Sequence, residues 1–320
     1  MSDLPSRGRV LVTPRSMTAA GVATLPALRP LTEAGYELVS GPPGRQPTAA
    51  DLHEVADGVV GWVAGVERID DEVLAAFPDL RAISRNGAGA DAIDAAAAER
   101  RGVQVATARG ANARGVAELA FAHVLAGLRG LPLADRVLRE GGWARTPGRE
   151  LPDLTVGVVG FGAIGRTLAG FAAAFGARVL VSDPFARVPE GPGAPRQVAL
   201  DELFAGSDVI SLHAPPPADG TALVGVAQLA TVPTGAVLVN TARSSLVDDA
   251  AVLAALESGR LSAYAVDAFE SEPPALTPLL RHERTILSPH LGGYTDASVR
   301  RATEQSVVNL LVMLDSGPPE

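Results

Sequence analysis

The clearest pattern of apolar and polar positions lies between residues 155 and 183. An apolar run, Thr155–Val159, has the β-branched composition of a buried parallel strand. A glycine-rich turn and an Ala-rich helical stretch to about Gly176 follow it. A second apolar run, Arg178–Ser182, then ends at Asp183. This order predicts a βαβ unit with two parallel strands.

Short apolar runs alternate with helical stretches along the rest of the chain. Such alternation predicts parallel sheets with helices on both faces, here in two α/β domains. Before the glycine-rich turn we expect strands at Arg9–Thr13, Glu37–Ser40, Gly58–Val63, Arg81–Ser84 and Val103–Ala106, and helices at Thr24–Ala34, Asp51–Ala56, Asp71–Ala76 and Asp91–Arg101. After it we expect strands at Asp208–His213, Ala236–Thr241, Ser262–Asp267 and Thr285–Ser288, and helices at Asp249–Ser258 and Ala297–Leu314, the last returning to the first domain.

A long apolar helical region separates the two groups of strands. It runs from Arg114 to about Gly130, and a second helix, Leu133–Arg139, leads into GGWAR. These helices exceed what one connection needs, so we expect the region, about residues 112–145, to enter the second domain and to supply a subunit interface. The alternative is that the helices pack only on the sheet of their own domain.

Composition narrows the class of protein. The chain has 320 residues, enough for two domains with a core each, and 47% of them are hydrophobic. A net charge of −9 gives no basic surface for nucleic acid or anionic lipid. Because no apolar run is long enough for a membrane span or a secretory signal, we expect a cytoplasmic protein with no nucleic-acid or membrane partner.

Two absent residue types exclude further chemistry. The chain has no cysteine, and all 27 of its Lys+Arg positions are arginine. Disulfides, thiolate nucleophiles, Schiff-base lysines and a P-loop lysine are therefore excluded. We expect no metal site, because the five histidines lack the short spacing of metal ligands. They are His53, His123, His213, His282 and His290.

The glycine-rich turn carries the strongest motif. Gly160, Gly162 and Gly165 form G-x-G-x-x-G between a strand and a helix. In a dinucleotide site the first glycine allows a tight turn, the second lets the pyrophosphate approach the helix N-terminus, and the third lets helix and strand pack closely. Asp183 ends the next strand, where a carboxylate binds the ribose hydroxyls and repels a 2′-phosphate, which favours NAD over NADP. The alternative is a purely structural βαβ unit.

Polar residues follow four strands of the second domain. His213, Arg243, Asp267 and His290 each come just after a predicted strand. Open parallel sheets bind ligands outside the carboxyl ends of their strands, so these side chains are expected to form one site. Taken singly, Arg243 is more simply explained as a surface charge and His290 as a hydrogen-bonded structural group, and Glu272, before two prolines, as a residue of a solvated loop.

Carbonyl reduction with a nicotinamide cofactor needs three protein groups. One is an acid near neutral pKa, one is a carboxylate that orients it, and one is a cation that holds an anionic substrate. His290, Glu272 and Arg243 supply these types, and a guanidinium can bind a carboxylate with two hydrogen bonds. In the first domain, a loop of small residues, NGAGADAID, follows Arg85 and could hold an anion on its backbone amides. It could equally be a glycine turn that begins a helix.

These motifs resemble the D-isomer-specific 2-hydroxyacid dehydrogenase family over almost the whole chain. The matching stretches are SRNGAGADAID, VAELA, GVVGFGAIGR, VSDP, LHAP, VNTARSSLVD, AVDAFESEPP and SPHLGG. The resemblance implies that Arg243 binds the carboxylate of a 2-oxo or 2-hydroxy acid, that His290 is the acid/base, and that Glu272 pairs with it. It also implies that Asp267 holds the carboxamide of NAD.

The resemblance assigns further residues to each ligand. It places the cofactor NAD on Gly160, Gly162, Ala163, Ile164, Gly165, Asp183, His213, Ala214, Thr241, Ala242, Asp267 and Gly292. It places the substrate on Arg85, Asn86, Ala88, Gly89 and Arg243.

The resemblance also implies a domain plan and an assembly. A Rossmann domain that binds NAD, residues 107–292, is inserted in a discontinuous flavodoxin-like α/β substrate domain, residues 1–106 and 293–320. The helices of about 112–145 make a homodimer. The motif DAFE departs from the usual DVFE, and the loop APPPADGT is rich in proline. Neither departure touches the three catalytic roles.

Substrate and activity retain alternatives. Glu272 and the absence of lysine disfavour the formate and phosphite dehydrogenases of the same superfamily. Arg85 resembles an arginine of phosphoglycerate dehydrogenases, so the 2-hydroxy or 2-oxo acid could carry a second anionic group, phosphate or phosphonate. The alternative to an enzyme is an NAD(H)-sensing binding protein of the same fold, as in the C-terminal-binding corepressors.

Overall fold

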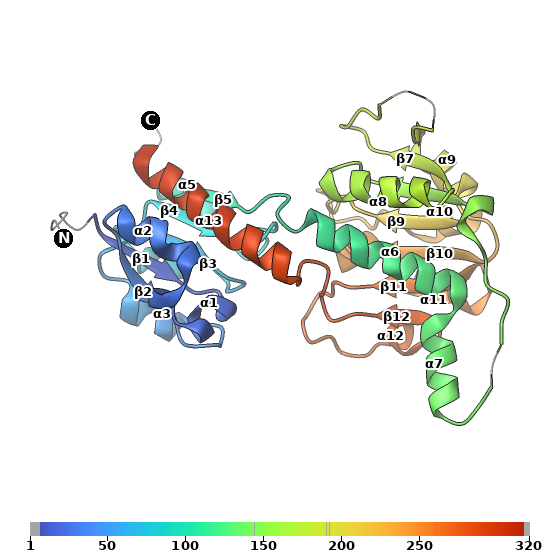
Figure 1. Cartoon of the computed structure of the whole chain (residues 1–320), viewed down its shortest axis with the longest axis horizontal. Helices are drawn as coiled ribbons and strands as arrows, with labels where there is room; N and C mark the ends of the chain where they lie inside the picture. The colour runs from blue at the N-terminus through green and yellow to red at the C-terminus, as the bar shows by residue number, and fades with distance from the viewer. Residues whose placement is uncertain (1–6, 144, 190, 192, 317–320) are drawn as a thin grey trace. The chain divides into compact units, whose positions relative to one another are not determined.

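The computed structural model describes residues 7–143, 145–189, 191 and 193–316. The described residues form two compact units, drawn in Figure 1. One unit holds the chain up to Asn112 together with the chain from Asp296, and the other holds Ala113–Thr295. These boundaries lie a few residues C-terminal to the positions 106 and 292 expected from the sequence.

The first unit is built on a parallel sheet of five strands in the order β2-β1-β3-β4-β5. Buried apolar residues fill both faces of this sheet, so helices must cover each face. Leu52, Val73 and Ala97 pack on one face, and Met17 and Leu31 pack on the other. The strands are β1 (Arg9–Val12), β2 (Glu37–Ser40), β3 (Val59–Ala64), β4 (Ala82–Arg85) and β5 (Gln104–Thr107). The helices are α1 (Arg15–Ala20), α2 (Arg29–Glu33), α3 (Ala49–Val55), α4 (Asp71–Ala75), α5 (Ala95–Arg100) and α13 (Asp296–Ser316).

The C-terminal helix α13 completes the core of this first unit, so the chain returns to it after the second unit. Leu310 and Leu314 are buried beside Val10 and Val63. Gly61 on β3 makes room for them, because a Cβ there would lie 3.0 Å from Leu314 Cδ1. Full burial of a leucine contributes roughly 1.5–3 kcal/mol, so α13 stabilises the sheet it covers.

The second unit is built on a parallel sheet of seven strands in the order β12-β11-β10-β9-β6-β7-β8. Alternate residues of β10 pack in the apolar cores on opposite faces of the sheet, because successive side chains of a strand point to opposite faces. The strands are β6 (Thr155–Val159), β7 (Arg178–Ser182), β8 (Arg196–Gln197), β9 (Val209–Leu212), β10 (Ala236–Asn240), β11 (Leu261–Val266) and β12 (Thr285–Leu287). The helices are α6 (Ala113–Arg129), α7 (Leu131–Arg139), α8 (Ala163–Ala174), α9 (Leu200–Gly206), α10 (Val226–Thr231), α11 (Asp249–Glu257) and α12 (Pro278–Arg281).

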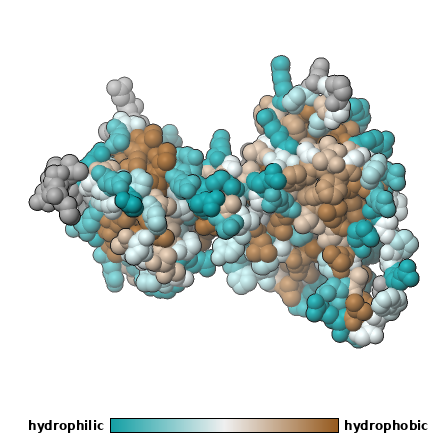
Figure 2. Space-filling view, in the orientation of Figure 1, coloured by the Kyte–Doolittle hydropathy of each residue, from teal (hydrophilic) through white to brown (hydrophobic). Residues whose placement is uncertain are grey.

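The two helices of the apolar block behave differently. Helix α6 contacts α8, β10 and β11, and its residues Ala120 and Val124 are fully buried. All nine residues of α7 are described, and none is buried. Helix α6 therefore packs on the sheet of its own unit, whereas α7 places no buried residue in that core. Figure 2 shows hydrophobic residues among hydrophilic ones in the region of α7. Leu131 and Leu138 of this helix are more than half exposed.

Two predicted helices differ from the observed elements for identifiable reasons. The stretch Thr24–Ala34 is not one helix, because Pro26 and Pro30 lack the N–H that helix hydrogen bonds need. It folds as the end of one 3₁₀ turn, Val22–Thr24, a second 3₁₀ turn, Pro26–Leu28, and the short helix α2. The helix expected from Asp91 begins only at Ala95, because Asp94 caps it by accepting a hydrogen bond from Ala97 N at 2.9 Å.

No single helix among the described residues is long and apolar enough to cross a bilayer. Helices α6 and α7 reach that length and apolarity only together, and a bend of 64° separates them. Within the same residues, no group of three or more His, Asp or Glu side chains could hold a metal ion.

Candidate active site

The chain reverses its direction of strand addition at the centre of the seven-stranded sheet. After β6 it adds β7 and β8 on one side, and then returns to add β9, β10, β11 and β12 on the other. The carboxyl ends of β6 and β9 therefore diverge at a topological switch point, where open α/β sheets bind ligands. The glycine motif follows β6, and His213 follows β9.

Each glycine of the motif has a different spatial reason to lack a side chain. Gly160 has a φ of 91°, and a Cβ there would lie 2.7 Å from the backbone carbonyl of His213. A Cβ on Gly165 would lie 2.0 Å from the carbonyl oxygen of Gly160. A Cβ on Gly162 would meet no described atom within 4 Å. Gly160 and Gly165 are therefore needed by the fold itself, whereas Gly162 borders open space where a ligand can approach.

The helix that starts at this motif presents its amino end to that space. Gly162 is the N-cap of α8, and no described side chain caps the helix there. A 12-residue helix concentrates a partial positive charge on its first N–H groups. Ala163 and Ile164 lie in its first turn, so their backbone can hold the pyrophosphate of a dinucleotide.

Asp183 is already held in place by backbone amides. Its Oδ2 accepts a hydrogen bond from Phe161 N at 2.6 Å, and its Oδ1 accepts from Phe185 N and Ala186 N at 2.8 and 2.9 Å. Partial burial raises the pKa of this carboxyl, but the three amides outweigh that effect and hold the pKa below its usual value. Asp183 is thus a fixed anion beside the glycine turn.

Two buried polar atoms lie at the ends of β9 and β10 without a partner among the described residues. They are Nδ1 of His213 and Oγ1 of Thr241. The other ring nitrogen of His213, Nε2, lies 2.9 Å from Ser211 Oγ, and desolvation lowers the pKa of His213 to about 4. Buried polar atoms in folded proteins are usually satisfied, so these two atoms are available to hydrogen-bond a ligand. With the open side of Gly162, the residues present fit a dinucleotide.

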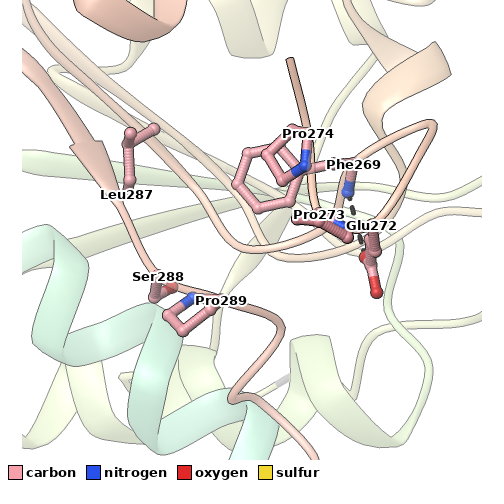
Figure 3. Close-up of a pocket in the computed structure, with 7 residues that line it drawn as sticks. All are labelled: Phe269, Glu272, Pro273, Pro274, Leu287, Ser288 and Pro289. Atoms are coloured by element: carbon pink, nitrogen blue, oxygen red, sulfur yellow. Dashed lines mark hydrogen bonds between the residues drawn. The ribbon is translucent and has the colours of Figure 1, made fainter. Parts of the chain in front are cut away.

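The structure brings His290 and Glu272 together from two separate loops. His290 Nδ1 lies 2.7 Å from Glu272 Oε1, and both side chains are about half exposed. Glu272 Oε1 also accepts a hydrogen bond from Phe269 N at 3.3 Å, drawn in Figure 3. His290 has a φ of 52°, an uncommon conformation for a residue with a side chain. The acid and its partner expected from the sequence are therefore in direct contact.

Asp267 is buried in the core of the second unit and has several partners. It is 1% exposed, and its Oδ1 accepts hydrogen bonds from Ser288 Oγ at 2.6 Å and from Leu291 N at 2.8 Å. Its Oδ2 accepts from Gly292 N at 2.8 Å. Asp267 therefore anchors the turn that carries His290, a role that sequence reasoning missed.

Arg243 is positioned by the loop after β10. Its side chain is half-buried, and its Nη1 donates to Ala242 O at 2.9 Å. Asn240, which is fully buried, donates through Nδ2 to Arg243 O at 2.8 Å and accepts from Ala242 N at 3.1 Å. Asn240 is a second residue that sequence reasoning missed, and it fixes the backbone from which the guanidinium extends.

The candidate residues of the first unit gather at the carboxyl end of β4. Arg85 donates through Nη1 to the carbonyl oxygen of Asn86, and Asn86 Oδ1 is buried with no partner among the described residues. Gly87 has a φ of 156°, and a Cβ there would lie 2.2 Å from Arg85 Nη1. Ala88 and Gly89 follow in the same loop. The guanidinium of Arg85 thus lies against this loop, at the place where the sequence left an anion site and a plain glycine turn as alternatives.

An apolar pocket adjoins Glu272 in the second unit, as Figure 3 shows. Its volume is about 400 Å³, a size that suits small ligands. It lies between the loop that follows β11 and the end of β12. Phe269, Glu272, Pro273, Pro274, Leu287, Ser288 and Pro289 line it.

Comparisons with known proteins agree with this geometry. Residues 121–292, just over half of the chain, match the family model described as D-isomer specific 2-hydroxyacid dehydrogenase, NAD binding domain. D-3-phosphoglycerate dehydrogenase of Mycobacterium bovis is 39% identical over 247 residues, which are 75% of this chain and 46% of that protein. The chain thus spans about half the length of that relative. Hydroxypyruvate reductase of Thermotoga maritima is 35% identical over 75% of this chain and 79% of its own length.

A solved structure extends the similarity to nearly the whole chain. D-lactate dehydrogenase from Aquifex aeolicus, crystallised with NAD and lactic acid, superimposes with a TM-score of 0.79. The two chains are 26% identical, and the match covers 96% of each.

Proposed function

Because this chain belongs to the D-isomer specific 2-hydroxyacid dehydrogenase family, we propose that it transfers a hydride between NAD and a D-2-hydroxy acid or its 2-oxo acid. The members of this family are oxidoreductases that act on CH–OH groups with NAD(P). The observation that carries the proposal is the 2.7 Å contact between His290 and Glu272, which pairs an imidazole with a carboxylate at the ligand-binding edge of the sheet.

In this proposal the second unit holds the cofactor. The first turn of α8 binds the pyrophosphate, and Asp183 binds the ribose. His213 Nδ1 and Thr241 Oγ1 are the buried groups that the cofactor satisfies, with Ala214, Ala242 and Gly292 alongside them. The bound nicotinamide supplies or accepts the hydride.

His290 moves the proton. Because Nδ1 is engaged by Glu272, Nε2 is the nitrogen that faces substrate, donating to the carbonyl oxygen in reduction and accepting from the hydroxyl in oxidation. Glu272 stabilises the imidazolium and fixes the orientation of the ring. Arg243 binds the substrate carboxylate, for which a planar guanidinium on a braced backbone is well suited.

We assign NAD rather than NADP because Asp183 is an anion held beside the glycine turn. The pKa of this carboxyl lies below its usual value, so it is charged at neutral pH and repels a 2′-phosphate.

We assign the first unit, residues 1–106 and 293–320 in the sequence-based division, to substrate binding. Arg85, Asn86, Ala88 and Gly89 are the residues proposed to contact substrate. A guanidinium at this loop is suited to a second anionic group, phosphate or phosphonate, on the 2-hydroxy acid. The chain's similarity to a phosphoglycerate dehydrogenase supports this assignment.

We also propose a homodimer formed through the helices of about residues 112–145. Helix α7 carries Leu131 and Leu138, which are 62% and 58% exposed, and Trp143 after it is 79% exposed. Exposed apolar groups so close together on one segment are typical of a protein interface.

Turnover of a panel of 2-oxo acids with NADH tests the function. The proposal predicts oxidation of NADH with at least one acid of the panel, and loss of that activity in His290→Asn. NADH binding without turnover of any acid would instead support an NAD-sensing role.

A further inference from the structure

A buried histidine outside the proposed catalytic residues reaches the turn that carries His290. His123 lies on α6 and is 6% exposed, and its Nε2 is 2.9 Å from Ser288 Oγ. Ser288 is 7% exposed and lies 2.6 Å from Asp267 Oδ1. An apolar side chain would fill this helix position more simply, because its neighbours Ala120 and Val124 are fully buried in the core.

The direction of these hydrogen bonds follows from the chemistry of Asp267. A carboxylate only accepts, so the hydroxyl of Ser288 must donate to it. The Ser288 oxygen is then the acceptor for an N–H on His123 Nε2. Burial lowers the pKa of His123, and the charge of Asp267 raises it by less, so the ring is neutral with its proton on Nε2.

The hydrogen bonds from His123 through Ser288 to Asp267 lead to residues on both sides of His290 in the chain. Asp267 accepts hydrogen bonds from the backbone amides of Leu291 and Gly292, the two residues that follow the histidine. Ser288, two residues before it, accepts His290 N at its own carbonyl oxygen at 3.0 Å. His290 itself has a φ of 52°, a conformation that costs energy unless its surroundings hold it.

We propose that His123 is a positioning residue for His290, acting through Ser288 and Asp267 to hold the turn 288–292. The catalytic part of this inference rests on the proposed function. The order of the groups differs from a hydrolase triad, because the serine lies between the acid and the histidine and its proton is committed to Asp267. The neutral Nε2–H of His123 fixes the serine oxygen, and the serine hydroxyl fixes Oδ1 of Asp267.

The test compares two substitutions at the same helix position. His123→Leu removes the donor to Ser288, whereas His123→Gln keeps an N–H at a similar distance from the backbone. Val124→Ala is the control for packing damage, since Val124 is fully buried on the same helix. Ser288→Ala interrupts the network at its centre and provides a second route should the leucine variant fail to fold.

Two readouts separate this inference from the proposed function. Hydrogen–deuterium exchange of the Leu291 and Gly292 amides needs no activity, and we expect it to be faster in His123→Leu and Ser288→Ala than in wild type or His123→Gln. In an active enzyme, kcat should fall about tenfold or more in the first two variants and recover in His123→Gln, because small misplacements of a catalytic group are costly. KM for the 2-oxo acid should change less than kcat.

Three results would overturn the inference. Exchange and kcat in the disrupted variants could equal those of wild type, His123→Gln could behave like His123→Leu, or Val124→Ala could reproduce both effects. A wild-type protein without dehydrogenase activity would refute the proposed function alone, because amide exchange would still report whether His123 holds the turn.

Discussion

His290 Nδ1 lies 2.7 Å from Glu272 Oε1, although the two residues are 18 positions apart and follow different strands, β12 and β11. Neighbouring parallel strands deliver their following loops to the same edge of the sheet, so β11 and β12 bring the two side chains together. This contact is the basis of the first prediction.

Glu272→Gln should lower kcat for reduction by about 10²-fold or more, the usual size of one acid–base contribution. The amide can still accept a hydrogen bond from His290, but it no longer supplies the negative charge that stabilises the imidazolium. Steady-state kinetics with saturating NADH measures the effect. Glu270→Gln is the matched control, because Glu270 is exposed in the same loop. Equal losses in the two variants would contradict the assignment of Glu272.

Asp183→Asn should narrow the preference for NADH over NADPH. The asparagine keeps a hydrogen-bond acceptor beside the glycine turn, but it does not repel a 2′-phosphate. The ratio of kcat/KM values for the two cofactors measures this preference. A wild-type enzyme that uses both cofactors equally would show that Asp183 does not select NAD.

Gly160→Ala and Gly162→Ala should fail in different ways. Gly160 has a φ of 91°, and a Cβ there would collide with the backbone carbonyl of His213. Its substitution should therefore lower the unfolding free energy by about 1–3 kcal/mol or more. Gly162 borders open space, so its substitution should leave the unfolding free energy nearly unchanged and weaken NADH binding. Denaturant unfolding and NADH titration test the pair. Normal NADH affinity in Gly162→Ala would place the pyrophosphate elsewhere.

Arg85→Ala and Arg243→Lys should differ in their dependence on substrate. Arg243→Lys should lower kcat/KM more than about tenfold for every 2-oxo acid, because an ammonium cannot make the paired contact with a carboxylate. Arg85→Ala should harm an acid with a second anionic group more than pyruvate, by roughly 1.5–3 kcal/mol for a lost charged hydrogen bond. The comparison needs kcat/KM for both substrate types in each variant. An equal loss for both types in Arg85→Ala would remove the second anionic group from the proposal.

His213 should make the folded state sensitive to mild acid. Its pKa is about 4 in the folded protein, against about 6.5 for an unperturbed histidine. The unfolded chain therefore takes up a proton first as pH falls, so the contribution of His213 to stability is complete above about 6.5 and is lost between about 6.5 and 4. Denaturant unfolding at pH 7 and pH 5 should show a smaller loss in His213→Gln than in wild type. Parallel losses would show that folding does not lower the pKa of His213.

Sequence reasoning predicted the two parallel sheets and nearly every strand, because buried strands are continuous apolar runs and parallel sheets need helices between them. It also predicted that His290 and Glu272 would act together, because carbonyl reduction needs an acid with a carboxylate partner and because the motifs resemble a known family. It missed the second role of Asp267 and the bracing role of Asn240, because a buried hydrogen bond depends on side-chain direction rather than on spacing. For His123, the sequence indicates only that metal-ligand spacing is absent. Its partner Ser288 is 165 positions away, and no local pattern connects them.

The configuration of the product tests the central claim most directly. Purified protein is incubated with NADH and simple 2-oxo acids, including pyruvate, glyoxylate and hydroxypyruvate, and the chiral products are separated by chiral chromatography. The proposed function predicts a D-2-hydroxy acid formed in step with NADH oxidation, and little product from His290→Asn. An L-2-hydroxy acid, or full activity in His290→Asn, would contradict it.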